Sequence, residues 1–421
     1  MTAQNVLLVT VDCMRRDRLS AYGYQRRTTP FFNSLLDRGL HCTSAHSTSS
    51  WTSPAVASML TGLYPHHHGA GIVPGNPKNL DRDHLPSPLS GDIPALGRLL
   101  PHHASGCVSA VPFTALTLED LPRWWDWSAQ MDGGGPVVVD RALRWIREQK
   151  APFFCWVHLG DAHDPLEVSR ELRDAFGPVT SYRKARKWAF TKRDDDVGSK
   201  EFREYAEART NLYDAAILAA DTAIGDLWTS LDAMRDDTFL IVTADHGEEL
   251  WEHRDEEIAS FEDPRGVAGA GHGQNLWQEI LLVPLLVHGP GVAPRAIEQN
   301  VSLVDVVPTI LEAAGSPVPD GLDGMSLFGD VPQDRAILAE GIAYGHEKAA
   351  VIVGERKLLS SPGDAYERVF VLDDARTESV GDASAADNLR PLLPPKLEVS
   401  GPTPRLTGEM ADHLRELGYI E

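Results

Sequence analysis

The stretch NVLLVTVD, residues 5–12, is a short run of apolar and β-branched side chains that ends in an acid. Such a run is typical of a parallel strand that is buried on both faces of a sheet. Three later stretches have the same form: PFFCWVHLGDAH at 152–163, TFLIVTADHG at 238–247 and EILLVPLLVHGPG at 279–291. Helical patterns lie between them, the longest at 200–234. This alternation predicts an α/β fold in which helices cover both faces of a mostly parallel sheet.

The character of the sequence changes towards its C-terminus. The stretches AAVIVGERKLLSS at 349–361 and ERVFVLDD at 367–374 are typical of antiparallel strands, and GEMADHLRELGYIE at 408–421 is typical of a closing helix. We therefore predict a catalytic domain over residues 1–316 and a small α+β subdomain over residues 317–421.

Composition and charge exclude several classes of partner. The chain has 421 residues, of which 42% are hydrophobic and 24% charged, as in ordinary soluble enzymes. Its formal net charge of -22 argues against nucleic acid and anionic membranes as partners. A protein this acidic that acts on an anion needs a local positive charge, which a metal ion supplies.

The sequence also bears on the location of the protein. No apolar stretch approaches the roughly 18 residues of a membrane span, and the opening MTAQ lacks the charged segment of a secretory signal. The four cysteines are scattered and form no CxxC pair, which is typical of reduced, buried thiols. These features predict a cytoplasmic protein and leave its oligomeric state open.

Three of the predicted strands end in side chains that can bind a metal ion. The ligand candidates at these ends are Asp12, then His158, Asp161 and His163, then Asp245 and His246. Ligands bind at the carboxyl ends of strands in open α/β sheets, so we expect these side chains to lie close together. Carboxylate and imidazole ligands favour zinc or manganese, with calcium and magnesium as the alternatives.

Each of these residues also has a structural interpretation. Asp12 alone could cap a helix, and His246 alone could be a hydrogen-bonded structural residue. In the segment that follows His246, we expect Glu248, Glu249 and Glu252 to lie in a solvated turn. Spacing alone therefore does not decide between a metal site and structural residues.

The segment WTSPAVASMLTG, residues 51–62, predicts a helix that begins with a hydroxyl residue. Pro54 suits the first helical turn, which places Thr52 or Ser53 at the N-cap. A hydroxyl there lies at the positive end of a helix, where an anion is stabilised. A divalent cation in contact with the hydroxyl would lower its pKa and make it a nucleophile. Thr52 is therefore either a helix cap or the residue that attacks the substrate.

Six blocks, in order along the chain, resemble the sulfatase-like branch of the alkaline phosphatase superfamily. VLLVTVDCMRRDRLSAYGY is similar to the opening strand and the D-x-x-R-x-D-x-L-x-x-x-G-Y motif of that family. TSPAVASMLTGLYPHHHG is similar to its T-x-P-S-x-x-S-L-L-T-G-x-x-P-x-x-H-G motif. The other blocks are HLGDAHDPLEV, TADHGEEL with GHGQNLWQEILLVPLLVHGPG, SLVDVVPTILEAAGSPVPDGLDGMSL and LRELGYIE. The resemblance implies an alkaline-phosphatase-like α/β/α sandwich.

The resemblance also implies roles for individual residues. A metal site with a nucleophile in it would consist of Asp12, Thr52, Asp245 and His246, with Thr52 as the nucleophile. His163 and His272 would lie on the substrate side, where they contact oxygens of the transferred group or give a proton to the leaving group. Further candidates for a second metal site or for substrate binding are Asp161, His158 and Arg15.

Departures from the sulfatase pattern narrow the implied chemistry. Most sulfatases carry C-x-P-S-R, in which a Cys or Ser becomes formylglycine. Here Thr52 cannot give that aldehyde, and Val56 replaces the supporting arginine. Cys13 stands where many sulfatases have a second aspartate, and no lysine-bearing G-K-x-H block is visible. The pattern is closer to that of superfamily phosphodiesterases and phosphotransferases.

The resemblance therefore implies a metal-dependent hydrolase of phosphate, phosphonate or sulfate esters with a threonine nucleophile, and phosphoesters are favoured. One alternative is a transferase that passes the phospho or sulfo group to an acceptor alcohol. Another is a catalytically degenerate binding protein, which the motif losses favour and the intact set of Asp12, Asp245 and His246 disfavours. The expected partner is a small anionic ester.

Overall fold

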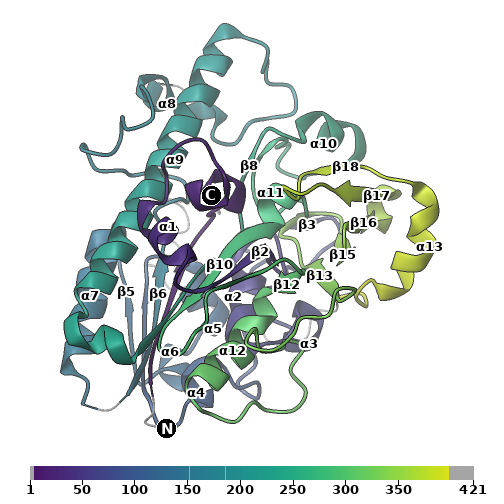
Figure 1. The fold of residues 1–421 in the computed structure, drawn as a ribbon. Coiled ribbons are helices and arrows are strands. Elements are labelled where there is room, and N and C mark those ends of the chain that lie inside the picture. The colour runs from purple at the N-terminus through teal and green to yellow at the C-terminus, as the bar shows by residue number, and fades with distance from the viewer. Residues whose placement is uncertain (1–3, 151, 185, 398–421) are drawn as a thin grey trace.

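The computed structural model describes residues 4–150, 152–184 and 186–397 (Figure 1). Within these residues, a nine-stranded mixed sheet forms the centre of the fold. Its strands, in spatial order, are β11 (Arg295–Ile297), β2 (Leu40–His46), β10 (Leu282–His288), β7 (Thr238–Ala244), β1 (Asn5–Val11), β6 (Phe153–Leu159), β4 (Ala104–Ser109) and β5 (Trp127–Gln130), and β12 (Val301–Ser302) also pairs with β2. The predicted helix at 408–421 lies outside the described residues.

Five neighbouring strands, β7, β1, β6, β4 and β5, run parallel. In this register Thr10 of β1 lies opposite His158 of β6 and Thr243 of β7, so the carboxyl ends of three predicted strands meet at one edge. The prediction of a mostly parallel sheet is confirmed. The exception is β10, which runs antiparallel to both β7 and β2. A buried apolar run has the same composition in either direction, so the sequence did not reveal this reversal.

One group of helices packs around the long helix α9 (Lys200–Thr229), as Figure 1 shows. Its neighbours are α1 (Pro30–Leu36) and α7 (Gly135–Glu148), and α7 also packs against β6 and β4. At the start of α9, the side chain of Ser199 accepts the backbone N–H of Phe202 and so satisfies one of the open donors of the helix.

A second group of helices contains α2 (Thr52–Thr61), which packs against α5 (Phe113–Leu118) and α12 (Val306–Ala313). All ten residues of α2 are buried. The helix ends at Gly62, which adopts the left-handed conformation (φ 74°) that glycine accepts without steric cost. The interior position of α2 keeps the side chain of its first residue, Thr52, away from bulk water.

A separate five-stranded antiparallel sheet lies C-terminal to the central sheet, as predicted. Its strands, in order, are β13 (Ala336–Glu340), β15 (Ala349–Val353), β16 (Arg356–Ser361), β17 (Tyr366–Leu372) and β18 (Glu378–Val380), followed by α13 (Ala386–Leu389). The inward-facing Val351, Leu358 and Val369 pack with Leu389 into a small core. The exact boundary at residue 316 stays a prediction.

Short elements complete the described chain. The two-residue strands pair as β3 (Lys78–Asn79) with β14 (Tyr344–Gly345) and β8 (Glu249–Leu250) with β9 (Ala270–Gly271). The short helices are α3 (Pro65–His68), α4 (Leu96–Leu99), α6 (Leu121–Trp124), α8 (Thr180–Lys184), α10 (Arg254–Ser260) and α11 (Gln278–Leu281). All four cysteines are free and buried, as predicted. In the part of the chain that the structure describes, no helix combines the length and apolar character that a bilayer span requires.

Candidate active site

The side chains predicted to bind a metal meet at the carboxyl edge of the central sheet. Asp12 directly follows β1, and Asp245 and His246 directly follow β7, the strand paired with β1. Each of the three is at most 1% exposed. The parallel register of two strands therefore brings together residues that lie more than 200 positions apart in the sequence.

The imidazole of His246 is the centre of this cluster. Its Nε2 lies 3.3 Å from Asp12 Oδ1, 3.6 Å from Asp245 Oδ2 and 3.3 Å from Thr52 Oγ1. Its Nδ1 lies 2.8 Å from the carbonyl oxygen of Gly247 and donates to it, which leaves the lone pair on Nε2. Ligand atoms that share one ion at about 2.1 Å lie roughly 3.0–3.5 Å from one another, so this spacing suits a common cation.

Two buried atoms at this place have no hydrogen-bond partner among the described residues. They are Asp245 Oδ2 and His158 Nε2, which lie 3.8 Å apart on side chains with no solvent exposure. The other nitrogen of His158 is held by Thr10 Oγ1 at 2.7 Å. Burial, together with the charge of Asp245, raises the pKa of Asp12 well above its ordinary value. A divalent cation would satisfy these atoms and stabilise the charged carboxylates, so the residues present fit such an ion.

Thr52 is the first residue of α2, and the expectation that Thr52 or Ser53 caps the helix is wrong. Trp51 occupies the N-cap, and no described side chain forms a cap hydrogen bond there. The helix begins one or two residues earlier than predicted. Thr52 Oγ1 contacts His246 Nε2, and Ser53 Oγ pairs with Thr117 Oγ1 at 2.7 Å. Thr52 is therefore not the N-cap of α2.

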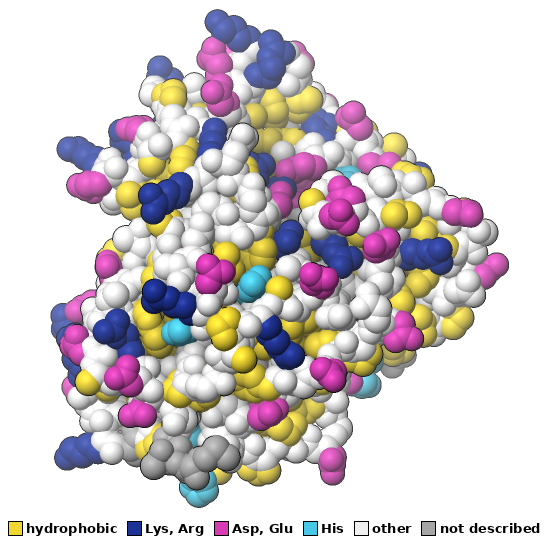
Figure 2. All heavy atoms as spheres, viewed as in Figure 1, with side chains coloured by type: hydrophobic (Ala, Val, Ile, Leu, Met, Phe, Trp, Pro, Cys, Tyr) yellow, Lys and Arg dark blue, Asp and Glu magenta, His cyan; other side chains and the backbone are white. Residues whose placement is uncertain are grey.

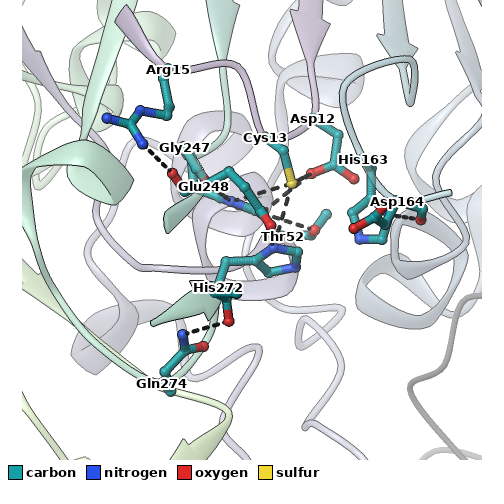
Figure 3. A network of polar contacts seen from close by, with 12 residues as sticks. Asp12, Cys13, Arg15, Thr52, His163, Asp164, Gly247, Glu248, His272 and Gln274 are labelled. Atoms are coloured by element: carbon teal, nitrogen blue, oxygen red, sulfur yellow. Dashed lines mark hydrogen bonds and ion pairs between the residues drawn. The ribbon is translucent and has the colours of Figure 1, made fainter. Parts of the chain in front are cut away.

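Two further histidines lie beside this cluster, as Figure 3 shows. His163 follows β6 and His272 follows β9, and their ring centroids are 5.1 Å apart. His163 Nδ1 donates to the carbonyl oxygen of Asp164, and His272 Nδ1 donates to Glu248 Oε2 at 2.7 Å. Burial lowers the pKa of His272 to about 4, so this ring is neutral at pH 7. The sequence prediction places both histidines beside the candidate metal ligands, and the structure brings them close to that cluster.

Glu248 and Arg209 are residues that sequence reasoning missed. The expectation that Glu248, Glu249 and Glu252 lie in a solvated turn is wrong for the first two, which are 6% and 0% exposed. Arg209 of α9 donates to Glu248 Oε1 at 3.0 Å and forms an ion pair with Asp164 Oδ2 at 2.7 Å.

This arginine links Asp164, the neighbour of His163, to Glu248, the carboxylate that contacts His272. Burial raises the pKa of Glu248, but His272 and Arg209 outweigh burial and bring the pKa to about 2. Glu248 is therefore an ionised carboxylate that fixes the orientation of His272. Its only sequence signal was its position two residues after His246.

Arg15 and Asp161 lie near the site but serve other contacts. The guanidinium of Arg15 donates to Asp17, to Glu252 and to the carbonyl oxygen of Glu248, so it supports the loop after β7. Asp161 accepts the backbone N–H of Gly135 at the start of α7. Neither side chain joins the ligand cluster, which weakens their assignment to a second metal site.

The Sulfatase family model matches residues 4–100 and 136–316. The chain belongs to the sulfatase family. Human arylsulfatase K is 30% identical over 383 residues, which cover 77% of this chain and 66% of the human protein. The chain spans slightly less than two thirds of the length of the curated arylsulfatase K relatives that it matches.

Solved structures of sulfatase-like proteins share the fold. The phosphonate monoester hydrolase of Agrobacterium radiobacter superimposes with a TM-score of 0.68 at 20% identity, over 92% of this chain and 94% of that protein. A protein solved in complex with its substrate D-glucosamine-2-N,6-O-disulfate superimposes with a TM-score of 0.69 at 16% identity, over 99% and 98% of the two chains. These likenesses establish the alkaline-phosphatase-like architecture.

A cavity of about 250 Å³ opens beside the ligands of this sulfatase-family chain. Polar lining residues include Asp12, Asp161 and His163, and the apolar part of the wall includes Phe113 and Met131. The cavity therefore gives a small molecule access to the ligand cluster from one side.

A second cavity, of about 430 Å³, adjoins the first and shares Pro165 and Glu167 with it. Its lining includes Arg173, Arg183 and Arg186. Figure 2 shows basic side chains, mixed with acidic ones, at the end of the molecule that α8 and the start of α9 form. The second cavity therefore places three arginines next to the first one, in a chain whose net charge is -22.

Proposed function

We propose that this protein hydrolyses phosphate, phosphonate or sulfate esters of a small anionic substrate, with a divalent cation at Asp12, Thr52, Asp245 and His246. The observation that carries the proposal is the position of Thr52 Oγ1, buried at the start of α2 and 3.3 Å from His246 Nε2. This hydroxyl does not cap its helix and lies beside the candidate metal ligands, where a bound cation would activate it as a nucleophile. A cation held by these residues supplies positive charge to the oxygens of the ester and lowers the pKa of the adjacent hydroxyl.

Thr52 acts as the nucleophile in a reaction of two steps. Thr52 Oγ1 forms a bond to phosphorus or sulfur while the bond to the leaving oxygen breaks, and the proton of Thr52 passes to that oxygen. Water next attacks the Thr52 ester, releases phosphate or sulfate and restores the hydroxyl. The two steps together consume one ester and one water and yield one alcohol and one acid.

The two histidines are suited to carry the proton between these groups. Each uses Nδ1 to donate to a protein oxygen, so Nε2 is the proton-accepting atom of the neutral ring. His272 is neutral at pH 7 because burial lowers its pKa to about 4. Glu248 and the carbonyl of Asp164 hold the two rings in place, which favours proton transfer at a fixed position.

The choice between phosphorus and sulfur has an argument on each side. Threonine cannot become formylglycine, and Val56, the residue at the position of the supporting arginine, is buried inside α2. This favours phosphate or phosphonate esters. The curated relatives are named arylsulfatases, which favours sulfate esters. We propose phosphoesters as the better substrates because the nucleophile itself decides the chemistry.

A substrate screen with matched variants tests this proposal. Purified protein is assayed with aryl phosphate, phosphodiester, phosphonate and sulfate esters, each with zinc, manganese, calcium and magnesium. Thr52→Ser should retain appreciable activity because it keeps a hydroxyl at the start of α2. Thr52→Val keeps the shape without the hydroxyl and should lose at least about 10⁴-fold in kcat. A Thr52→Val protein that turns over at the wild-type rate removes Thr52 from the reaction.

A further inference from the structure

Cys13 places a buried thiol directly at the ligand cluster. It follows Asp12 in sequence and has no solvent exposure. Its Sγ lies 3.3 Å from Asp12 Oδ1 and 3.9 Å from His246 Nδ1. On the other side, Sγ lies 3.5 Å from His272 Nδ1. Figure 3 shows the sulfur between Asp12 and His272.

The backbone of Cys13 is held in a conformation that a non-glycine residue rarely adopts. Its φ is 62°, in the left-handed region, which strains an ordinary side chain. Tyr213 of α9 fixes this conformation, because its hydroxyl donates to the carbonyl of Cys13 and accepts the backbone N–H of Arg15 at 3.1 Å. A glycine would remove the strain and also the thiol. The cysteine side chain therefore occupies a strained backbone position directly beside the ligand cluster.

The Cys13 thiol belongs to one of two groups of possible ligand atoms, and both groups include Asp12. Asp12, Cys13 and His246 each offer a ligand atom, and these atoms lie within 4.8 Å of one another. Asp12, His158 and Asp245 form a second such group, in which Asp245 Oδ2 and His158 Nε2 are buried without a hydrogen-bond partner among the described residues. Asp12 belongs to both groups, so the two groups meet at its carboxylate, whose Oδ1 lies 3.3 Å from Cys13 Sγ and 3.3 Å from His246 Nε2.

We propose that Cys13 binds the divalent cation of this site as a thiolate and makes the site select zinc over calcium and magnesium. The inference rests on the metal site of the proposed function and adds one ligand and a metal preference to it. Thiolate is a soft ligand that favours zinc, whereas calcium and magnesium prefer oxygen ligands alone. On binding, the S–H bond breaks, a sulfur–metal bond forms and the proton leaves to solvent.

Cobalt(II) is the probe that reports this bond, because a thiolate bound to cobalt(II) gives an intense near-ultraviolet charge-transfer absorption and oxygen or nitrogen ligands do not. Metal-free wild-type protein is titrated with Co²⁺ alone and followed by absorption. We expect the band to grow until one equivalent is bound, to vanish when Zn²⁺ is added, and to persist in excess Ca²⁺ or Mg²⁺.

Matched variants assign the band to one sulfur. Cys13→Ser and Cys13→Asp should bind Co²⁺ without the band, although both retain the other three cysteines. Cys42→Ala, which removes a buried thiol of β2, should keep the band and serves as the control. In Cys13→Asp, Ca²⁺ should compete with Zn²⁺ at least about tenfold better than in the wild type, because a carboxylate replaces the soft ligand.

The outcomes separate this inference from the proposed function. Wild-type protein that binds one equivalent of Co²⁺ without the band overturns the thiolate ligand and leaves the metal site in place. Protein that takes up no Co²⁺ or Zn²⁺ overturns both. The wild-type spectrum decides the central point even where a Cys13 variant fails to fold, and a band that survives in Cys13→Ser also contradicts the assignment.

Discussion

Two clusters of histidine and carboxylate in this molecule have a similar composition and opposite character. One is the cluster around His246, at the edge of the central sheet. The other joins His253 to Glu279 and to Glu378 of β18, where the C-terminal sheet meets the rest of the fold. In both, three ligand atoms lie close enough to share an ion. Composition and proximity alone therefore do not distinguish them.

The partners of each histidine show the difference. His253 Nδ1 lies 2.7 Å from Glu279 and its Nε2 lies 3.3 Å from Glu378, so both nitrogens pair with acids on opposite sides of the ring. Lys357 adds a cation 2.7 Å from Glu378. Around His246, by contrast, two carboxylates and a hydroxyl all face Nε2. The His253 cluster balances its own charges, whereas the His246 cluster leaves an excess of negative charge that a cation would neutralise.

The largest effect should follow from Asp245→Asn, which changes a carboxylate of the cluster around His246. It should abolish metal binding and lower kcat/KM by at least about 10⁴-fold, because it removes a charged ligand atom. The metal-free variant should melt no lower than metal-free wild type, since the buried Asp245 Oδ2 has no hydrogen-bond partner among the described residues. Metal analysis and thermal unfolding in chelator check this, and full metal occupancy in the variant contradicts it.

His163→Gln and His272→Gln should have the next largest effect. Each should lower kcat/KM by roughly 10²–10⁴-fold, the range of a positioned proton carrier. Zinc content should stay the same, because the proposed ligand set contains neither residue. Steady-state kinetics and metal analysis are measured together, and a loss of stoichiometric metal would place these histidines among the ligands instead.

Glu248→Gln should lower kcat/KM by roughly tenfold, because a neutral amide orients His272 less firmly than a carboxylate does. Glu249→Gln is the matched control. Burial and the nearby Glu257 raise the pKa of Glu249 well above its ordinary value, so an amide resembles its neutral form. Equal losses in the two variants would show that burial of the loop, and not the contact with His272, is what matters.

A substitution in the cluster around His253 should change the stability of the protein and not its catalytic activity. His253→Gln should lower the free energy of unfolding by about 2 kcal/mol, because it removes one of the two cations that Glu279 and Glu378 face and leaves Lys357 alone, and it should leave kcat/KM nearly unchanged.

The pH dependence of this link has a definite sign. Burial lowers the pKa of His253, but Glu279 and Glu378 outweigh burial and raise it above its ordinary value of 6.5. The stabilisation is therefore complete below about pH 6.5 and is lost as pH rises through the raised pKa. Urea unfolding of wild type and His253→Gln across this range should show the difference shrinking with pH, and a constant difference would contradict the ionic link.

The sequence predicted much of the fold because its signals are local. Strands were predicted from the buried runs at 5–12, 152–163 and 238–247. The acids and histidines at the ends of these runs indicated the candidate active site. The antiparallel direction of β10 was missed because a run of apolar residues carries no direction.

The side chains that the sequence misplaced depend on partners far along the chain. Glu248 was expected in solvent, but Arg209, which lies 39 residues away, pairs with it in the interior. Thr52 was a candidate cap until the structure showed the helix starting one residue earlier, with its hydroxyl facing His246. Local patterns cannot show which distant charge will neutralise a buried acid, so these roles required the fold.

The most direct test of the central claim is mass spectrometry of protein quenched during turnover. With the best ester from the substrate screen, we expect the peptide that contains Thr52 to carry an added phosphoryl or sulfuryl group, and we expect Thr52→Val to carry none. Wild-type protein that turns over its substrate while this peptide stays unmodified, or a group found on Cys13 instead, would contradict Thr52 as the nucleophile.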